Sequence, residues 1–158
     1  MKRTILISAL LFASVLVKAQ ILVYPDNRLF FTDMLVNINK EGALVEGNRT
    51  SSEGAMYTVR ENKVYRGWSY AEQEVMFTVN DNKIYRGNED FSIPLYTIKD
   101  GKFYRGNSTK EEDLLYTWLR IGVFKGTSTS PFDRVCFIQG RATQAEYFAV
   151  LLALGLLE

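Results

Sequence analysis

The stretch Leu95-Tyr-Thr-Ile-Lys-Asp-Gly-Lys-Phe-Tyr-Arg-Gly106 decides the fold, because its pattern returns along the chain. Further copies span residues 56–67, 76–87 and 115–126, a degraded copy spans 35–47, and Cys136-Phe-Ile-Gln-Gly140 resembles the first half of a sixth. The glycines that close five of these copies follow one another at intervals of 20, 20, 19 and 20 residues. Such a regular period indicates tandem structural repeats, here over residues 35–140.

Each copy has the pattern of a β-hairpin, with two short runs of aromatic and β-branched residues around a turn dipeptide. The dipeptides are Glu61-Asn62, Asp81-Asn82 and Asp100-Gly101. These residue types tolerate the positive φ angles of a two-residue type I′ turn. Such a turn places Val59 opposite Val64, on the face that we expect to form the main core. It places Thr58 opposite Tyr65 on the other face.

The connections between the hairpins are short and polar, so consecutive hairpins should lie side by side. The fold class is therefore mainly β, with tandem β-hairpin repeats that form a solenoid or a closed meander barrel. The period does not distinguish these two. Thr143-Gln-Ala-Glu146 matches a capping box and predicts an α-helix over residues 143–157. We expect this helix to cap the last hairpin, whose edge would otherwise be exposed.

The N-terminus has the pattern of a secretory signal peptide. Lys2 and Arg3 precede an apolar stretch, and Val17-Lys18-Ala19 predicts cleavage after Ala19. The predicted domains are a signal peptide at 1–19 and one repeat domain at 20–158. A retained N-terminal anchor helix is the alternative. We expect a secreted, periplasmic or cell-surface protein that is not an integral membrane protein after cleavage; periplasm and surface are not distinguished.

Composition excludes several classes of function. The 158 residues include 19 Lys and Arg and 18 Asp and Glu, a net charge of +1, and cleavage after Ala19 would leave −2. Neither value favours nucleic acid as a partner. The absence of histidine excludes Ser-His-Asp and Cys-His nucleophiles and His-bearing zinc sites. The single cysteine, Cys136, aligns with Met or Leu of other copies and is expected in the core.

No metal-ligand spacing and no phosphate-binding loop is present, so we expect no catalytic residue, no metal and no cofactor. An enzyme is the least favoured class. If the protein were an enzyme, it would be a carboxylate-dependent hydrolase, and the candidate catalytic residues would be the clustered acids Glu111, Glu112 and Asp113. Acidic clusters in connections are usually only solvated surface.

Five aromatic residues are the candidate ligand-binding residues. If the hairpins stack in register, Tyr65, Tyr85 and Tyr104 form a ladder beside threonine hydroxyls, which suits sugar or peptide docking. The alternative is that these rings fill a second core layer. Trp68 and Tyr70 break the repeat consensus in one connection, which makes that connection a second place for a site.

Residues 56–126, with aromatics on both strands of hairpins about twenty residues long, resemble choline-binding repeats and the related repeats of clostridial toxins. Those families are hairpin solenoids that hold ligands between aromatic side chains. This sequence lacks their Gly-Trp opening and their Trp-Tyr-Tyr second strand, so the ligand does not carry over. Copies like Tyr96-Thr-Ile-Lys-Asp-Gly-Lys-Phe-Tyr-Arg-Gly106 are also similar to small exported repeat proteins of Bacteroidetes-type bacteria without assigned activity. That resemblance implies export.

The favoured function is an exported, non-catalytic binding protein that presents the Tyr/Thr ladder to a glycan, a cell-wall polymer or an envelope or host protein. The alternative is a structural or assembly component of the cell envelope with no small ligand. In that alternative, hairpin edges or the C-terminal helix support self-association.

Overall fold

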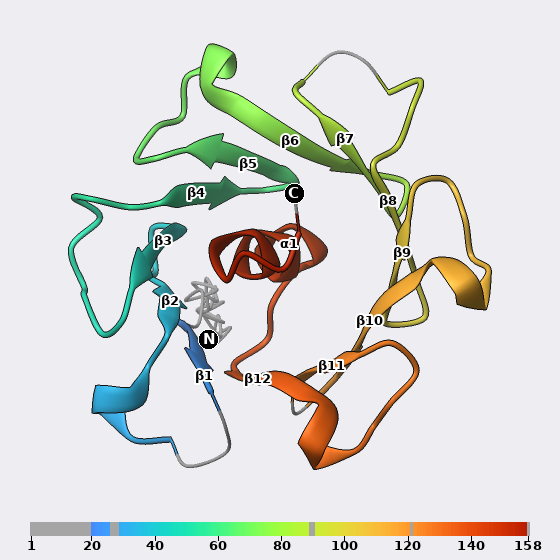
Figure 1. Cartoon of the computed structure of the whole chain (residues 1–158). Helices are drawn as coiled ribbons and strands as arrows, with labels where there is room; N and C mark the ends of the chain where they lie inside the picture. The colour runs from blue at the N-terminus through green and yellow to red at the C-terminus, as the bar shows by residue number, and fades with distance from the viewer. Residues whose placement is uncertain (1–19, 26–28, 89–90, 121, 158) are drawn as a thin grey trace, which may run out of the picture.

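The computed structural model describes residues 20–25, 29–88, 91–120 and 122–157. Within them, twelve antiparallel strands form a closed barrel (Figure 1). The strands are β1 (Ile21–Tyr24), β2 (Val36–Ile38), β3 (Ala43–Glu46), β4 (Tyr57–Arg60), β5 (Lys63–Arg66), β6 (Val75–Asn80), β7 (Lys83–Arg86), β8 (Tyr96–Lys99), β9 (Lys102–Arg105), β10 (Leu114–Leu119), β11 (Gly122–Lys125) and β12 (Arg134–Gln139). Each strand pairs with its neighbour in the chain, and β12 pairs with β1.

The predicted hairpin register is confirmed. Val59 pairs with Val64 and Thr58 with Tyr65. In the next hairpin Asp81 and Asn82 have φ angles of 47° and 60°, as a type I′ turn requires. The sixth hairpin is made by the two ends of the barrel, because β12 pairs with β1. That pairing closes the sheet, so the fold is the meander barrel and not the solenoid.

Helix α1 (Gln144–Ala153) runs inside the barrel (Figure 1). The predicted capping box is present: the Thr143 hydroxyl accepts the Glu146 N–H at 3.3 Å, and the Glu146 carboxylate accepts the Thr143 N–H at 2.8 Å. Every residue from Ala145 to Leu151 is buried. The helix therefore fills the barrel instead of covering an edge, because a closed sheet has no edge to cover.

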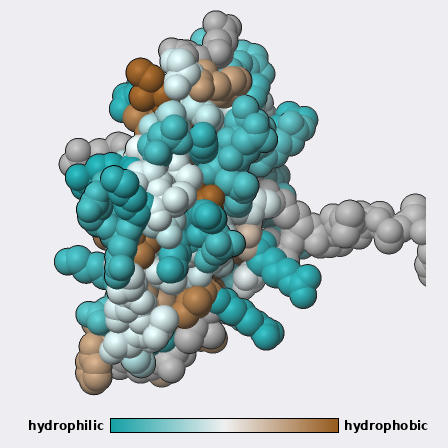
Figure 2. Space-filling model, turned by 90° about the vertical axis from the view of Figure 1, so that its right-hand side faces the viewer, coloured by the Kyte–Doolittle hydropathy of each residue, from teal (hydrophilic) through white to brown (hydrophobic). Residues whose placement is uncertain are grey.

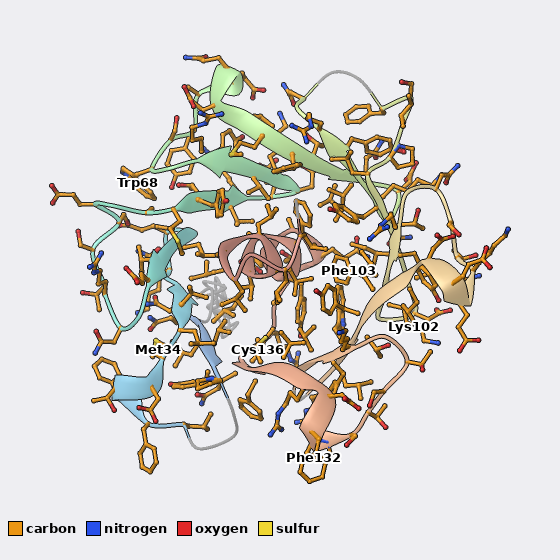
Figure 3. The ribbon with its side chains drawn as sticks, in the orientation of Figure 1. Met34, Trp68, Lys102, Phe103, Phe132 and Cys136 are labelled. Atoms are coloured by element: carbon orange, nitrogen blue, oxygen red, sulfur yellow. The ribbon has the colours of Figure 1, made fainter. Side chains whose placement is uncertain are left out.

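The inward faces of the strands and α1 form one core. Phe148 packs edge-on against Phe77, with ring centroids 5.0 Å apart, and Tyr147 stacks on Trp118 at 4.1 Å. Figure 3 shows Phe103 directed towards the helix, in contrast to Phe132, which points away from the barrel. The hairpin face that carries Val59 and Val64 belongs to this core, as predicted.

The outward faces of the hairpins form a second buried layer. The connections cover these faces, so that Tyr70 lies over Tyr65 and Phe91 over Tyr85, with centroids 6.2 and 5.1 Å apart. Each buried outer threonine donates its hydroxyl to the carbonyl of the glycine that closes its hairpin, at 2.6–2.7 Å. These pairs are Thr58 with Gly67, Thr78 with Gly87, Thr97 with Gly106 and Thr117 with Gly126.

Four connections contain short 3-10 helices, which lie at the periphery of the barrel in Figure 1. They are η1 (Phe31–Asp33), η2 (Glu72–Glu74), η3 (Glu111–Asp113) and η4 (Pro131–Asp133). The flank that Figure 2 presents is mostly hydrophilic, with separate apolar spots. In the described part of the chain, no helix is both long and apolar enough to cross a membrane.

Replacing Thr78 by valine should lower the free energy of unfolding by about 1–3 kcal/mol, because the half-buried Gly87 carbonyl loses its donor while the side-chain volume is kept. Urea unfolding followed by circular dichroism measures the change. Thr109→Val on an exposed connection is the control and should leave the midpoint unchanged. An equal loss in both variants would contradict a specific role for the buried hydroxyl.

Replacing Phe148 by alanine should cost about 3–5 kcal/mol, because the fully buried ring leaves a cavity between α1 and the barrel. The same unfolding experiment measures this. Ile93→Ala, at a side chain that is 78% exposed, serves as the control and should change little. A helix that merely caps the barrel from outside would give a small loss for Phe148→Ala as well.

Candidate functional site

The tyrosine ladder faces outward, but its rings are buried. Tyr65, Tyr85 and Tyr104 are 5, 6 and 7% exposed. The expectation that these rings form a ladder open to ligands is therefore wrong. The alternative, that they fill a second core layer, is correct. The physical reason is the return of each connection over the outer face of its hairpin, which places the rings of Tyr70 and Phe91 over the first two.

Trp68 and Tyr70 remain at the surface, 44% and 41% exposed. They lie in the connection between β5 and β6, with their rings edge-to-face and centroids 5.2 Å apart. Trp68 directly follows the closing glycine Gly67, a position at which Asn48, Asn88 and Asn107 stand in other copies. The hairpin therefore does not need an aromatic ring at this position.

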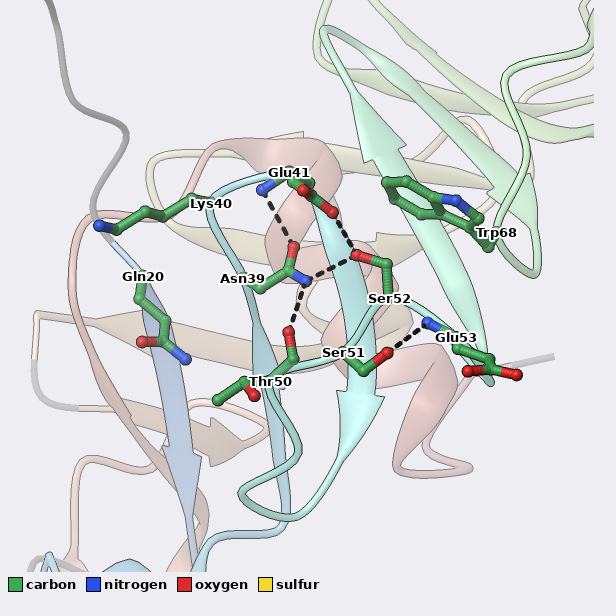
Figure 4. Close-up of a pocket in the computed structure, with 9 residues that line it drawn as sticks. All are labelled: Gln20, Asn39, Lys40, Glu41, Thr50, Ser51, Ser52, Glu53 and Trp68. Atoms are coloured by element: carbon green, nitrogen blue, oxygen red, sulfur yellow. Dashed lines mark hydrogen bonds between the residues drawn. The ribbon is translucent and has the colours of Figure 1, made fainter.

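Trp68 borders an open pocket of about 540 Å³ on the outside of the barrel (Figure 4). The remaining lining comes from three places: the turn between β2 and β3, the connection between β3 and β4, and the residue that precedes β1. These residues are Gln20, Asn39, Lys40, Glu41, Thr50, Ser51, Ser52 and Glu53. Figure 4 shows Trp68 at one side, Lys40 and Gln20 at the other, and hydroxyl and carboxylate groups between them.

Asn39 organises the floor of the pocket. Its side-chain oxygen accepts the backbone N–H groups of Glu41 and Ala43, each at 3.0 Å. Its amide nitrogen donates to the Ser52 hydroxyl at 2.9 Å and more weakly to the Thr50 carbonyl at 3.4 Å. The Ser52 hydroxyl in turn donates to the Glu41 carboxylate. This network holds the Glu41 carboxylate in a defined position at the pocket.

Gly42 allows the turn that carries Glu41. Its φ angle is +87°, and a Cβ atom there would lie 2.2 Å from the carbonyl oxygen of Val59. The close approach lets the Val59 N–H donate to the Gly42 carbonyl at 2.8 Å, which continues the sheet from one hairpin to the next. The wall of the pocket is thus part of the barrel framework.

Tyr70 joins the two connections at the pocket. Its hydroxyl donates to the Glu41 carbonyl at 3.0 Å, and the guanidinium of Arg60 lies 5.2 Å from its ring centroid. Burial, and secondarily the charge of Glu41, raises the pKa of Tyr70, although Arg60 acts in the opposite direction. The hydroxyl therefore stays protonated at neutral pH and continues to donate.

The arrangement offers a flat apolar ring beside groups that bind hydroxyls. Among the described residues, the indole N–H of Trp68 has no hydrogen-bond partner and the Glu53 carboxylate has no ion-pair partner. The indole N–H is thus an open donor and the Glu53 carboxylate an open acceptor at the pocket. A ligand that combines an apolar face with hydroxyl groups matches this combination of a π-face and polar groups.

Among the described residues, neither a cluster of metal-ligating side chains nor the cysteine lies at the pocket. The described residues contain no cluster of three or more His, Cys, Asp or Glu side chains fit for a metal ion. Cys136 is fully buried, as predicted, and burial raises the pKa of its thiol to about 12, which keeps it protonated. It lies opposite Val123, and this register aligns it with Phe77 and Tyr116, one position beyond the alignment inferred from sequence.

The clustered acids of the connections make local contacts. Asp113 accepts the Ser108 hydroxyl, and Glu112 lies 3.6 Å from Lys110 on the exposed surface. Glu72 pairs with Lys63 at 3.1 Å. None of these acids lines the pocket beside Trp68. The predicted signal peptide lies outside the described residues.

Sequence reasoning found Trp68 and Tyr70 but missed Asn39, Glu41 and Ser52. The signal for Asn39 and Glu41 is the degraded first copy, residues 35–47, in which the consensus turn is replaced by Asn-Lys-Glu-Gly; Ser52 lies in the connection that follows this copy. A departure from the repeat in two successive copies indicates a shared site only once the copies are known to be neighbours. The strand order confirms that successive hairpins are neighbours, as the short connections predict.

The six connections around one closed barrel agree with what a comparison with protein families found. The model of the 6-fold beta flower protein family matches residues 9–94, more than half of the chain. Neither curated proteins nor solved structures gave a match. The chain belongs to the 6-fold beta flower protein family.

Proposed function

We propose that this protein is an exported, non-catalytic binding module that holds a glycan in the pocket between Trp68 and Asn39. The exposed indole carries the proposal, because it stands at a position where three other copies have asparagine. A bulky ring that folding does not require, at the edge of a pocket, is a reason to expect a ligand.

A sugar fits the polar groups as well as the ring. One face of a pyranose presents C–H groups to an aromatic surface, while its hydroxyls point to the sides. The Glu41 and Glu53 carboxylates accept such hydroxyls, and Lys40 and the Trp68 N–H donate. The volume of about 540 Å³ falls within the range of small-ligand sites and accommodates a short stretch of a polymer.

The hydrogen bonding of the pocket carboxylates favours binding without catalysis. The Glu41 carboxylate accepts the Ser52 hydroxyl in a network whose other members are themselves hydrogen-bonded. Glycoside hydrolysis needs a protonated acid with a raised pKa facing a second carboxylate across the scissile bond. In the pocket the Glu41 carboxylate is engaged by Ser52 and Glu53 lies on an exposed connection, an arrangement that favours holding a sugar over cleaving it. The cell envelope or a host surface is the proposed place of such a glycan.

The proposal is tested with residues 20–158 on cell-wall polymer and a panel of insoluble polysaccharides, followed by titration with soluble oligosaccharides of those retained. Trp68→Asn should weaken binding about tenfold or more, because the stacking surface is lost while the repeat's own residue takes its place. Glu41→Gln should weaken binding by a smaller factor, since the amide keeps only part of the acceptor function.

Phe132→Ala is the matched control, because it removes an exposed aromatic ring outside the pocket. It should bind as the parent does, and circular dichroism should show all variants folded. Equal retention of the parent and Trp68→Asn would refute the pocket as the site. Retention of neither protein on any polymer would refute the glycan proposal itself.

A further inference from the structure

The four 3-10 helices of the connections are structurally equivalent, which allows their residues to be compared one by one. In each, the backbone N–H of the third residue donates to the carbonyl just before the helix, at 2.9–3.1 Å. These bonds run from Asp33 to Phe30, Glu74 to Ala71, Asp113 to Lys110 and Asp133 to Ser130. The same turn is therefore built four times from different side chains.

Two of these turns, η1 and η4, carry exposed phenylalanines at positions where η2 and η3 carry polar residues. Phe31, 62% exposed, stands in η1 where η2 and η3 have Glu72 and Glu111. Phe132, 99% exposed, stands in η4 where η3 has Glu112. Since glutamate forms the same turn, folding does not require an apolar ring at these positions. Exposed apolar side chains that folding does not require indicate an interaction surface.

The two turns occupy neighbouring connections. The connection between β1 and β2 and the connection between β11 and β12 flank the β12–β1 pair that closes the barrel (Figure 1). Phe132 points away from the barrel in Figure 3. We call the exposed apolar residues of these two connections the phenylalanine edge; they are Leu29, Phe30, Phe31 and Phe132.

Opposite charges lie beside this edge. Asp33 ends η1 and Arg134 follows η4, and neither has an ion-pair partner among the described residues. Asp33 accepts the Thr32 hydroxyl at 3.2 Å, and the Arg134 guanidinium lies 5.9 Å from the Phe137 ring centroid. The second connection also carries Asp133, which accepts the Ser128 hydroxyl at 2.6 Å within that connection. Asp33 on one connection and the half-buried Arg134 on the next form a pair that is complementary to itself after a two-fold rotation.

We propose that the phenylalanine edge joins two copies of this chain about a two-fold axis, with the phenylalanines packed together and Asp33 of each copy facing Arg134 of the other. A lipid surface fits less well, because interfacial anchoring favours flanking Lys and Arg in excess, whereas η1 and η4 end in Asp33 and Asp133. The surface does not include Trp68, so the pairing is independent of the proposed glycan site.

Sedimentation of residues 20–158 between about 1 and about 100 µM, the range of weak protein pairs, tests the proposal. The mass should double as the concentration rises. The variant with Phe31→Glu and Phe132→Glu should remain a monomer with an unchanged unfolding midpoint, because η2 and η3 form the same turn with glutamate. Ile93→Glu is the control: it places glutamate on another exposed connection and should still dimerise.

Charge reversal tests the orientation. Asp33→Arg alone and Arg134→Asp alone should each weaken dimerisation, and the variant with both changes should recover it. A monomer at every concentration overturns the proposal, and so does a dimer that keeps its affinity in the Phe31→Glu, Phe132→Glu variant. A monomer that sediments with phosphatidylcholine–phosphatidylglycerol vesicles through its phenylalanines overturns it in favour of a lipid surface. Trp68→Asn should dimerise normally, which separates this result from the glycan test.

Discussion

The pairing of β12 with β1 is the constraint on which the rest of the structure depends. It joins the two ends of the described domain, with Val23 opposite Ile138, and it removes both edges of the sheet. A barrel of about eight strands is just filled by its own side chains, whereas twelve strands enclose more space. The closed sheet therefore needs an internal filling, and α1 supplies it. Closure and the buried helix are two consequences of one strand pair.

The hairpins were predictable because their information is local. The turn dipeptides and the alternation of side chains fix the register of Val59 with Val64 without reference to the rest of the chain. Closure was not predictable in the same way, because the second half of the sixth hairpin, Ile21–Tyr24, stands before the repeats and shows no repeat pattern. Pairing between the first and the last strand does not change the spacing of the repeats, so the repeat period does not predict it.

The sequence contains signals for the internal position of helix α1 and for the burial of the tyrosines. The turn residues and the side-chain alternation of the hairpins do not reveal them. After its first turn, helix α1 carries apolar or aromatic residues on every side, which is typical of a helix surrounded by protein rather than one lying on a surface. The hairpins likewise carry apolar or aromatic residues on both faces, which favours two buried layers. The connections cover the outer layer. Their path depends on contacts between different copies, such as the hydrogen bond of Tyr70 with Glu41.

Repetition separates the requirements of folding from those of function in this chain. The closing glycines, the outer threonines and the inward aliphatic residues recur because each hairpin needs them, and their hydrogen bonds recur with them. Residues that differ at equivalent positions, such as Trp68 in place of asparagine or Phe132 in place of glutamate, are free of that requirement. Both departures lie in connections, where a rigid scaffold commonly carries its specific side chains. In a repeated fold, candidate functional residues are therefore best sought at positions where the side chains differ between copies although the backbone hydrogen bonds are the same.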